Sequence, residues 1–234
     1  MFTGCKSQPH EEVYVSDLYN IHEEYKDAWG NVGKYDISLP YIHCGSKSAK
    51  KLNQTIKSEY KGLIDSLDEA KELGYTLPYT KVSYDVYTHS NLLSIVIKEE
   101  VETDYPSYNV YHFDSKTKKR VSNKKLYKKY KISRKDMKVW AAQAFDQEYA
   151  NEYFDNVKEL RAQTMGLLPS NLDVFYHKGK LNVLIPIATN YGSGTKMVLY
   201  RPNRKKSYKI EDSSTFDQMT LTLKNNKISL YYSG

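Results

Sequence analysis

The residues whose types and spacing most clearly suggest chemistry are basic, and they are concentrated in residues 116–138. Twelve lysines and arginines lie there against one acid, Asp136, so the stretch has a formal charge of +11. Because the whole chain carries +7, all other residues together sum to −4. A local excess of positive charge attracts polyanions, and we predict a polyanion-binding surface. It comprises Lys116, Lys118, Lys119, Arg120, Lys124, Lys125, Lys128, Lys129, Lys131, Arg134, Lys135 and Lys138.

Three interpretations of this stretch stay open. The first is a solvated face whose charge is partly neutralised by the acidic N-terminal region or by Asp146, Glu148, Glu152 and Asp155. The second is a site for an anionic polymer outside the cell, such as teichoic acid, phospholipid headgroups or carboxylated peptidoglycan, since each lysine near an anionic surface contributes roughly 1 kcal/mol. The third is nucleic acid, bound through phosphate electrostatics, although the chain contains no recognised nucleic-acid module.

No arrangement of side chains in the sequence indicates catalysis. The histidines and Cys44 lack the spacing of a metal site such as His-x-x-x-His, although His89, at a turn, and His112, on a nearby strand, could approach each other. His43 adjoins Cys44, but neighbours on a strand point to opposite faces, which argues against a dyad. The adjacent acids at residues 99–100 do not indicate a glycosidase pair. We predict no catalytic residue, no metal and no cofactor.

The N-terminal residues suggest a cellular address. Residues 2–5 (Phe-Thr-Gly-Cys) resemble the lipobox of bacterial lipoproteins, with Phe where Leu is commoner, but without the usual signal-peptide regions before it. The rest of residues 1–33 is polar and acidic, which suits a tether followed by a short helix. No apolar run approaches the roughly 20 residues of a membrane-spanning helix. We predict a soluble body, lipid-anchored at Cys5 on the extracytoplasmic side of the cell membrane; a disulfide between Cys5 and Cys44 is the rival interpretation.

The first elements that must position the basic stretch are predicted from hydrophobic periodicity. Apolar residues alternate with polar ones over residues 35–43, which predicts a strand. Pro40 within it calls for a sheet edge or a bulge. Apolar residues then recur three or four apart. They predict a helix that is capped by Ser46 or Ser48 and stopped by Gly74.

The remaining elements are a meander of strands, two helical stretches and hairpins. Strands over residues 81–88, 92–101 and 108–113 are joined by loops too short for crossovers, so they are expected to be antiparallel. The basic stretch contains a helix, and a long helix is predicted over residues 133–165. The whole is an α+β fold, with one or more antiparallel sheets and at least two packed helices. Two hairpins complete it: residues 172–176 with 181–187, and residues 219–223 with 228–232.

Three segments of the chain resemble one known domain. They are Ile37-Ser-Leu-Pro-Tyr-Ile42 with Leu52, Asn53 and Ile56 in the following helix, residues 108–118 (Tyr-Asn-Val-Tyr-His-Phe-Asp-Ser-Lys-Thr-Lys, with Lys118 where Gly is usual), and residues 123–128 (Asn-Lys-Lys-Leu-Tyr-Lys). The domain, of unknown function, occurs outside Gram-positive cells. It forms the ectodomain of the lysozyme-sensing anti-sigma-V factor and the N-terminal domain of some peptidoglycan deacetylases.

The resemblance has consequences for domain organisation and function. It covers residues 34–200, so residues 1–33 are expected to be the lipoprotein tether. Residues 201–234 are expected to be a C-terminal β-hairpin extension packed on the same domain. Because no deacetylase domain follows and no catalytic residue matches, the resemblance implies binding or sensing rather than catalysis.

We therefore expect a non-catalytic extracytoplasmic lipoprotein of a Gram-positive bacterium. Its partner would be an anionic envelope polymer, teichoic acid or peptidoglycan, or a secreted protein. The alternatives are a peptidoglycan-acting hydrolase or deacetylase-associated protein, and a lysozyme-binding sensor. Lysozyme is itself basic, so a +11 face would repel it unless another side made the contact. Two facing carboxylates in a cleft would favour a hydrolase, whereas a tyrosine-rich face beside a basic ridge would favour binding.

Overall fold

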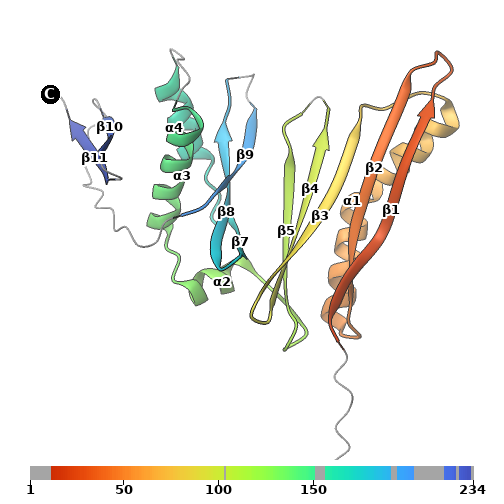
Figure 1. The fold of residues 1–234 in the computed structure, drawn as a ribbon, viewed down its shortest axis with the longest axis horizontal. Coiled ribbons are helices and arrows are strands. Elements are labelled where there is room, and N and C mark those ends of the chain that lie inside the picture. Colours follow the sequence, from red (N-terminus) through yellow and green to blue (C-terminus); the bar gives the residue numbers. More distant parts are fainter. Residues whose placement is uncertain are drawn as a thin grey trace, which may run out of the picture. The chain divides into compact units, whose positions relative to one another are not determined.

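The chain forms two units, each with its own strands (Figure 1). The computed structural model describes residues 12–102, 104–150, 156–190, 194–202, 219–224 and 227–232. Internal contacts divide the chain into Met1–Arg201 and Pro202–Gly234. The first unit contains helices and two sheets, so the predicted α+β class is confirmed.

The larger sheet has six strands that lie in chain order: β1 (Tyr14–Lys26), β2 (Val32–His43), β3 (Thr80–His89), β4 (Leu92–Val101), β5 (Ser107–Asp114) and β6 (Lys119–Val121). The predicted meander β3-β4-β5 is antiparallel throughout. The sheet as a whole is mixed, because β2 and β3 pair in parallel. Helix α1 (Lys47–Leu73) connects these two strands and returns the chain to the same end of the sheet.

Residues 14–26 form the edge strand β1, and the short helix predicted for the N-terminal region is wrong. Some apolar residues here are three or four apart, which mimics a helical period. The strand forms because β2 supplies an antiparallel partner along its whole length, and aromatic and β-branched residues suit a sheet. The register shifts between Asp17 and Tyr19, opposite Pro40. The sequence predicted a sheet edge or a bulge at Pro40, and the bulge forms opposite Pro40, in strand β1.

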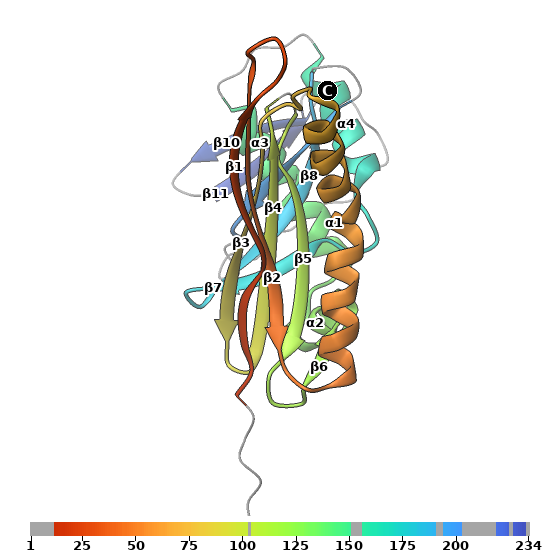
Figure 2. The same cartoon turned by 90° about the vertical axis from the view of Figure 1, so that its right-hand side faces the viewer.

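Helix α1 packs its apolar face on the larger sheet (Figure 2). Its caps are as predicted: Ser46 Oγ accepts a hydrogen bond from the Ala49 N–H at 3.1 Å, and Gly74 ends the helix with φ of 72°. The core between helix and sheet includes Leu52, Ile56 and Leu67 of α1 with Ile37, Leu39, Ile95 and Ile97 of the sheet.

A second, antiparallel sheet packs on the other face of the meander. Its strands are β7 (Asp173–His177), β8 (Lys180–Ala188) and β9 (Thr195–Tyr200). Val96 of β4 packs there against Phe175 of β7 and Leu184 of β8. Strand β4 is therefore buried on both faces, which explains its nearly continuous apolar sequence.

Three helices cover the remaining face of the second sheet: α2 (Asn123–Tyr130), α3 (Arg134–Glu148) and α4 (Val157–Leu167). The single helix predicted over residues 133–165 is therefore wrong. Helix α3 ends at Tyr149, whose hydroxyl donates to the Ala188 carbonyl of β8 at 2.8 Å. Helices α3 and α4 bury apolar residues in the same core. The spacing of their apolar residues therefore resembles that of one continuous helix.

The second unit contains one hairpin, in which β10 (Met219–Lys224) pairs with β11 (Lys227–Tyr232). The domain boundaries at residues 33 and 200, and the packing of residues 201–234 on the main domain, stay predictions. In the ranges that the structure describes, no helix has both the length and the apolar character to cross a membrane. Cys5 lies outside the described residues.

Candidate polyanion-binding surface

The twelve predicted basic residues lie on successive elements: the β5–β6 turn, β6, α2, the connection to α3 and the first turns of α3. All are exposed except Lys118, which is partly buried. We call this set the basic surface. The structure thus exposes every member of the predicted set except Lys118.

Helix α2 presents four lysines on one side. Lys124 and Lys128 are one turn apart, as are Lys125 and Lys129, so all four share a face. The opposite face is buried, and Tyr127 there donates its hydroxyl hydrogen to the backbone carbonyl that precedes β7. The amphipathic pattern therefore fixes which side of α2 carries the charge.

Acids that could have neutralised the basic surface are used elsewhere. The Asp146 carboxylate pairs with Arg161, with 3.0 Å between Oδ1 and Nε, and Glu148 Oε1 lies 2.6 Å from Lys196 Nζ. The other two acids named in the sequence analysis lie outside the described residues. Among the residues that the structure places, no ion pair involves an exposed member of the basic surface.

Two charged residues of the stretch have structural roles at the start of α3. Asp136 forms a capping box with Ser133: its Oδ2 accepts from the Ser133 N–H at 2.7 Å, and its own N–H donates to Ser133 Oγ at 3.1 Å. Arg134 donates to the Leu168 carbonyl at 3.0 Å, which ties this end of α3 to the end of α4. The charge of Arg134 is therefore partly engaged within the protein.

The tertiary structure adds three lysines that the charge pattern did not indicate. Lys47, Lys50 and Lys51 are exposed in the first turns of α1, where the first turn carries no acid. The Arg120 N–H donates to Ser48 Oγ at 2.7 Å, which joins this end of α1 to β6 across 72 residues of sequence. Figure 2 shows the start of α1 beside β6. The local sequence signal was only a weak excess of lysine.

A cavity of about 350 Å³ opens within the basic surface, between β5, β6 and the start of α2. Arg120 and Lys125 are its exposed basic residues. His112 and Asn123 also line it and are more deeply placed. The cavity therefore has cationic side chains at its mouth and neutral polar groups beneath them.

A chain of hydrogen bonds runs under this cavity. His112 Nδ1 lies 3.0 Å from Ser94 Oγ, and His112 Nε2 lies 3.2 Å from Asn123 Oδ1. The Asn123 amide in turn donates from Nδ2 to Asp173 Oδ1 at 2.7 Å. With the amide in this orientation, Nε2 carries the imidazole hydrogen and Nδ1 accepts from Ser94. The chain joins β4, β5, α2 and β7.

This chain contains a Ser–His pair, but its geometry is that of a structural network. Ser94 is 1% exposed and His112 is 2% exposed, so a substrate cannot reach the hydroxyl. Burial, reinforced by the charge of Arg120, lowers the pKa of His112 to about 4, and burial raises the pKa of Asp173. His112 is therefore neutral at pH 7. The two ring nitrogens of His112 contact Ser94 and Asn123, whereas the His89 ring stacks on Tyr176.

Aromatic rings lie next to the basic face of α2. His89 of β3 and Tyr176 of β7 stack with 4.4 Å between ring centroids, and Tyr130 at the end of α2 lies 4.7 Å from Tyr176. The Lys129 ammonium is 5.3 Å from the centre of the Tyr130 ring. These three rings form a small aromatic cluster beside the basic ridge of α2.

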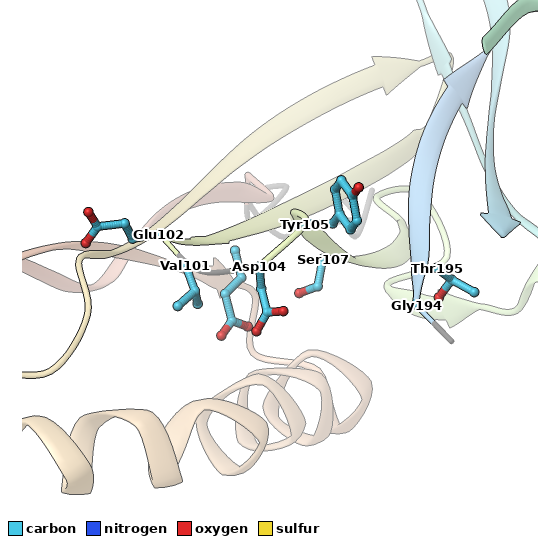
Figure 3. Close-up of a pocket in the computed structure, with 8 residues that line it drawn as sticks. Val101, Glu102, Asp104, Tyr105, Ser107, Gly194 and Thr195 are labelled. Atoms are coloured by element: carbon cyan, nitrogen blue, oxygen red, sulfur yellow. The ribbon is translucent and has the colours of Figure 1, made fainter. Parts of the chain in front are cut away.

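A second cavity, of about 860 Å³, is acidic (Figure 3). It lies between the β4–β5 loop and the start of β9, and its acids are Glu99, Glu102 and Asp104. In Figure 3 the side chains of Glu102 and Asp104 point in different directions, so these two do not form a facing pair. Within the described ranges, no three His, Cys, Asp or Glu side chains gather as a metal site would require.

The residues around Cys44 do not form a dyad. Cys44 is a partly buried free thiol. The neighbouring His43 is engaged elsewhere: its Nε2 lies 2.7 Å from Ser16 Oγ, and its ring stacks on Tyr14 at 4.2 Å.

Comparisons with known proteins find likeness in structure but none in sequence. No protein-family model matches the sequence, and no curated protein matches it. One similar solved structure is a member of the DUF3298 family, a domain of unknown function, from Bacteroides fragilis. It is 10% identical, with a TM-score of 0.44 over 85% of this chain and 93% of that chain. These values are too low to carry an argument about function, and they provide no link to the anti-sigma-V ectodomain or the deacetylase domain.

Proposed function

We propose that this protein is a non-catalytic module that binds an anionic polymer of the bacterial cell envelope. The observation that carries the proposal is the basic surface, whose exposed members have no acidic partner among the described residues. Holding so many like charges together costs free energy through mutual repulsion, and a polyanion relieves that repulsion. Teichoic acid and peptidoglycan are the polymers that we expect.

The distribution of the charge favours a polymer over a compact ligand. The basic residues extend over β6, α2 and the start of α3, and the lysines of α1 continue them. Lysine is a flexible point charge that adapts to irregularly spaced anions. Many such contacts, each weak, suit a long chain with repeating negative charge.

The proposal includes an extracytoplasmic location and a lipid anchor at Cys5. It is supported by the lipobox-like residues 2–5 and by the resemblance to the anti-sigma-V ectodomain. An alkyne-tagged palmitate fed to bacteria that express the chain would label the natural sequence and leave a Cys5→Ser variant unlabelled. Equal labelling of both proteins would contradict the anchor.

Sedimentation with Gram-positive cell walls tests the binding itself. We expect the chain to pellet with walls, to do so less after teichoic acid is removed, and to be released as salt rises, because salt screens charges beyond about 10 Å at 0.1 M. Replacing the α2 lysines with Gln should weaken binding at least about tenfold, since each contributes on the order of 1 kcal/mol. The variant combines Lys124→Gln, Lys125→Gln, Lys128→Gln and Lys129→Gln.

A matched control removes the same charge from exposed sites on other elements. It combines Lys26→Gln, Lys34→Gln, Lys57→Gln and Lys158→Gln. We expect less than about a threefold loss, since only the long-range field changes. Equal losses in both variants, or no pelleting of the natural sequence, would overturn the proposal.

A second candidate is a sensor of a basic protein such as lysozyme, and the acidic cavity favours it. Glu99, Glu102 and Asp104 line a surface that a basic partner could contact without meeting the basic surface. Surface plasmon resonance with lysozyme over the immobilised chain would test it. A Glu102→Gln, Asp104→Asn variant that binds lysozyme as well as the natural sequence does would rule out this cavity.

A further inference from the structure

The cavity beside Arg120 differs from the rest of the basic surface because it is a hollow, open to solvent, rather than an array of flexible lysines. Its volume of about 350 Å³ lies at the lower end of the range for small-ligand sites. That space exceeds what a single inorganic anion occupies. It suits an anionic group together with the organic groups on either side of it.

The lower part of the cavity is rigid and neutral. Hydrogen bonds from Ser94 to His112 and from His112 to Asn123 fix the imidazole, and Asn123 is fixed again by its hydrogen bond to Asp173. These groups are already bonded to one another, so they shape the cavity without supplying a charge. A ligand anion must be held by the side chains at the mouth.

The mouth carries two cations from two different elements. The Arg120 guanidinium of β6 lies 5.7 Å from the centre of the Tyr111 ring, which supports its plane from one side. Its backbone is fixed by the hydrogen bond to Ser48. Lys125 of α2 lines the same cavity and is exposed. The carboxylate of Glu59 accepts the hydrogen bond of the Tyr111 hydroxyl.

We infer that this cavity binds one phosphodiester group, with Arg120 and Lys125 holding its two charge-bearing oxygens. The inference rests on the proposed polymer-binding function and names its ligand class: a chain of polyols joined by phosphodiesters. Arginine's planar fork matches two phosphate oxygens at once, and lysine adds a second point of charge. A phosphodiester also continues on both sides of the phosphorus atom, which fits a cavity larger than the anion alone.

NMR titration of the full chain with glycerophosphoglycerol, a soluble phosphodiester, tests the inference. We expect saturable shifts of the Arg120, Ser122 and Asn123 signals, and no comparable shifts with acetate at equal ionic strength. An Arg120→Gln, Lys125→Gln variant should lose at least tenfold in affinity. A Lys57→Gln, Lys158→Gln variant, which removes the same charge from exposed sites outside the basic surface, should change affinity less than twofold. Arg120→Lys, which keeps the charge but loses the fork, should lie between.

The outcomes separate this inference from the proposed function. Equal losses in the two double variants, or equal shifts with acetate, overturn the phosphodiester site even if walls still pellet the protein. Saturable diester binding without wall binding supports the site and overturns the polymer function. Vesicles of phosphatidylglycerol in phosphatidylcholine distinguish the two sources of the phosphodiester. If the protein pellets with these vesicles and the Arg120→Gln, Lys125→Gln variant does not, the ligand is a lipid headgroup. If the natural sequence does not pellet with them, the ligand is the polymer. Both results keep the phosphodiester site.

Discussion

At the scale of single residues, Asn53 is the side chain whose loss we expect to cost most for its size. It is 6% exposed, and its amide exchanges two hydrogen bonds of 2.9 Å with the backbone N–H and carbonyl of Ile42. Asn53→Ala leaves both buried backbone groups without partners, so the free energy of unfolding should fall by about 2–4 kcal/mol. Urea unfolding measures it. The exposed neighbour is the control: Gln54→Ala should change stability by less than about 0.5 kcal/mol.

His112 should make stability depend on pH. Its pKa is about 4 in the folded protein against an ordinary 6.5, chiefly because it is buried. Between these values the unfolded chain binds a proton that the folded protein does not. The free energy of unfolding therefore falls as pH falls through this window, by about 3 kcal/mol in total. Below pH 4 both states are protonated, and His112 adds no further change.

Comparison with a variant isolates this contribution. Asp173 acts in the opposite direction, since its raised pKa favours the folded state as pH falls. We therefore compare urea unfolding at pH 7 and pH 4.5 for the natural sequence and for His112→Gln. The stability lost on acidification should be about 2 kcal/mol smaller in the variant. Identical losses would show that His112 does not titrate as described.

At the scale of an element, two glycines of the α1 region should respond oppositely to the same change. A Cβ at either Gly62 or Gly74 meets no atom within 4 Å, so space does not distinguish them. Gly74 has φ of +72°, and Ala there should destabilise by about 1 kcal/mol. Gly62 lies inside the helix, and Ala there should stabilise by about 0.5–1 kcal/mol. Thermal unfolding followed by circular dichroism would show shifts of opposite sign; shifts of the same sign would refute the assignment of the cap.

At the scale of the main unit, two large cores are joined by a small cluster. One core lies under α1, the other lies under α2, α3 and α4, and Phe175 with Val96 and Leu184 packs between the sheets. Phe175→Ala should cost about 3–5 kcal/mol. It should also let β7–β9 exchange amide hydrogens while α1 and β4 stay protected, as mass spectrometry would show. Leu52→Ala, inside one core, is the control, and loss of all protection together in both variants would contradict this division.

Much of the fold could be predicted because it rests on local signals. The caps of α1, the β3-β4-β5 meander and the β7–β8 hairpin follow from periodicity and turn residues within a few positions of each other. The exposure of the basic residues of α2 could also be predicted, because the apolar residues of this helix occupy its buried face. Two predictions were wrong: the helix in the N-terminal region and the unbroken helix over residues 133–165. In each case the spacing of apolar residues fits the predicted helix and also fits what forms, strand β1 in the first case and helices α3 and α4 in the second.

The sequence by itself determined which residues are charged, which faces are apolar and where most elements begin and end. Only the tertiary structure decided which segments meet: β1 on β2, the start of α1 beside β6, and Asn123 between His112 and Asp173. The physical reason is that an amphipathic pattern states that a face must be covered but not what covers it. The candidate cavity itself is lined by residues 110–125 of the consecutive elements β5, β6 and α2. Tertiary structure adds the hydrogen bonds that hold its polar side chains, from Ser94 of β4 to His112 and from Asn123 to Asp173 of β7.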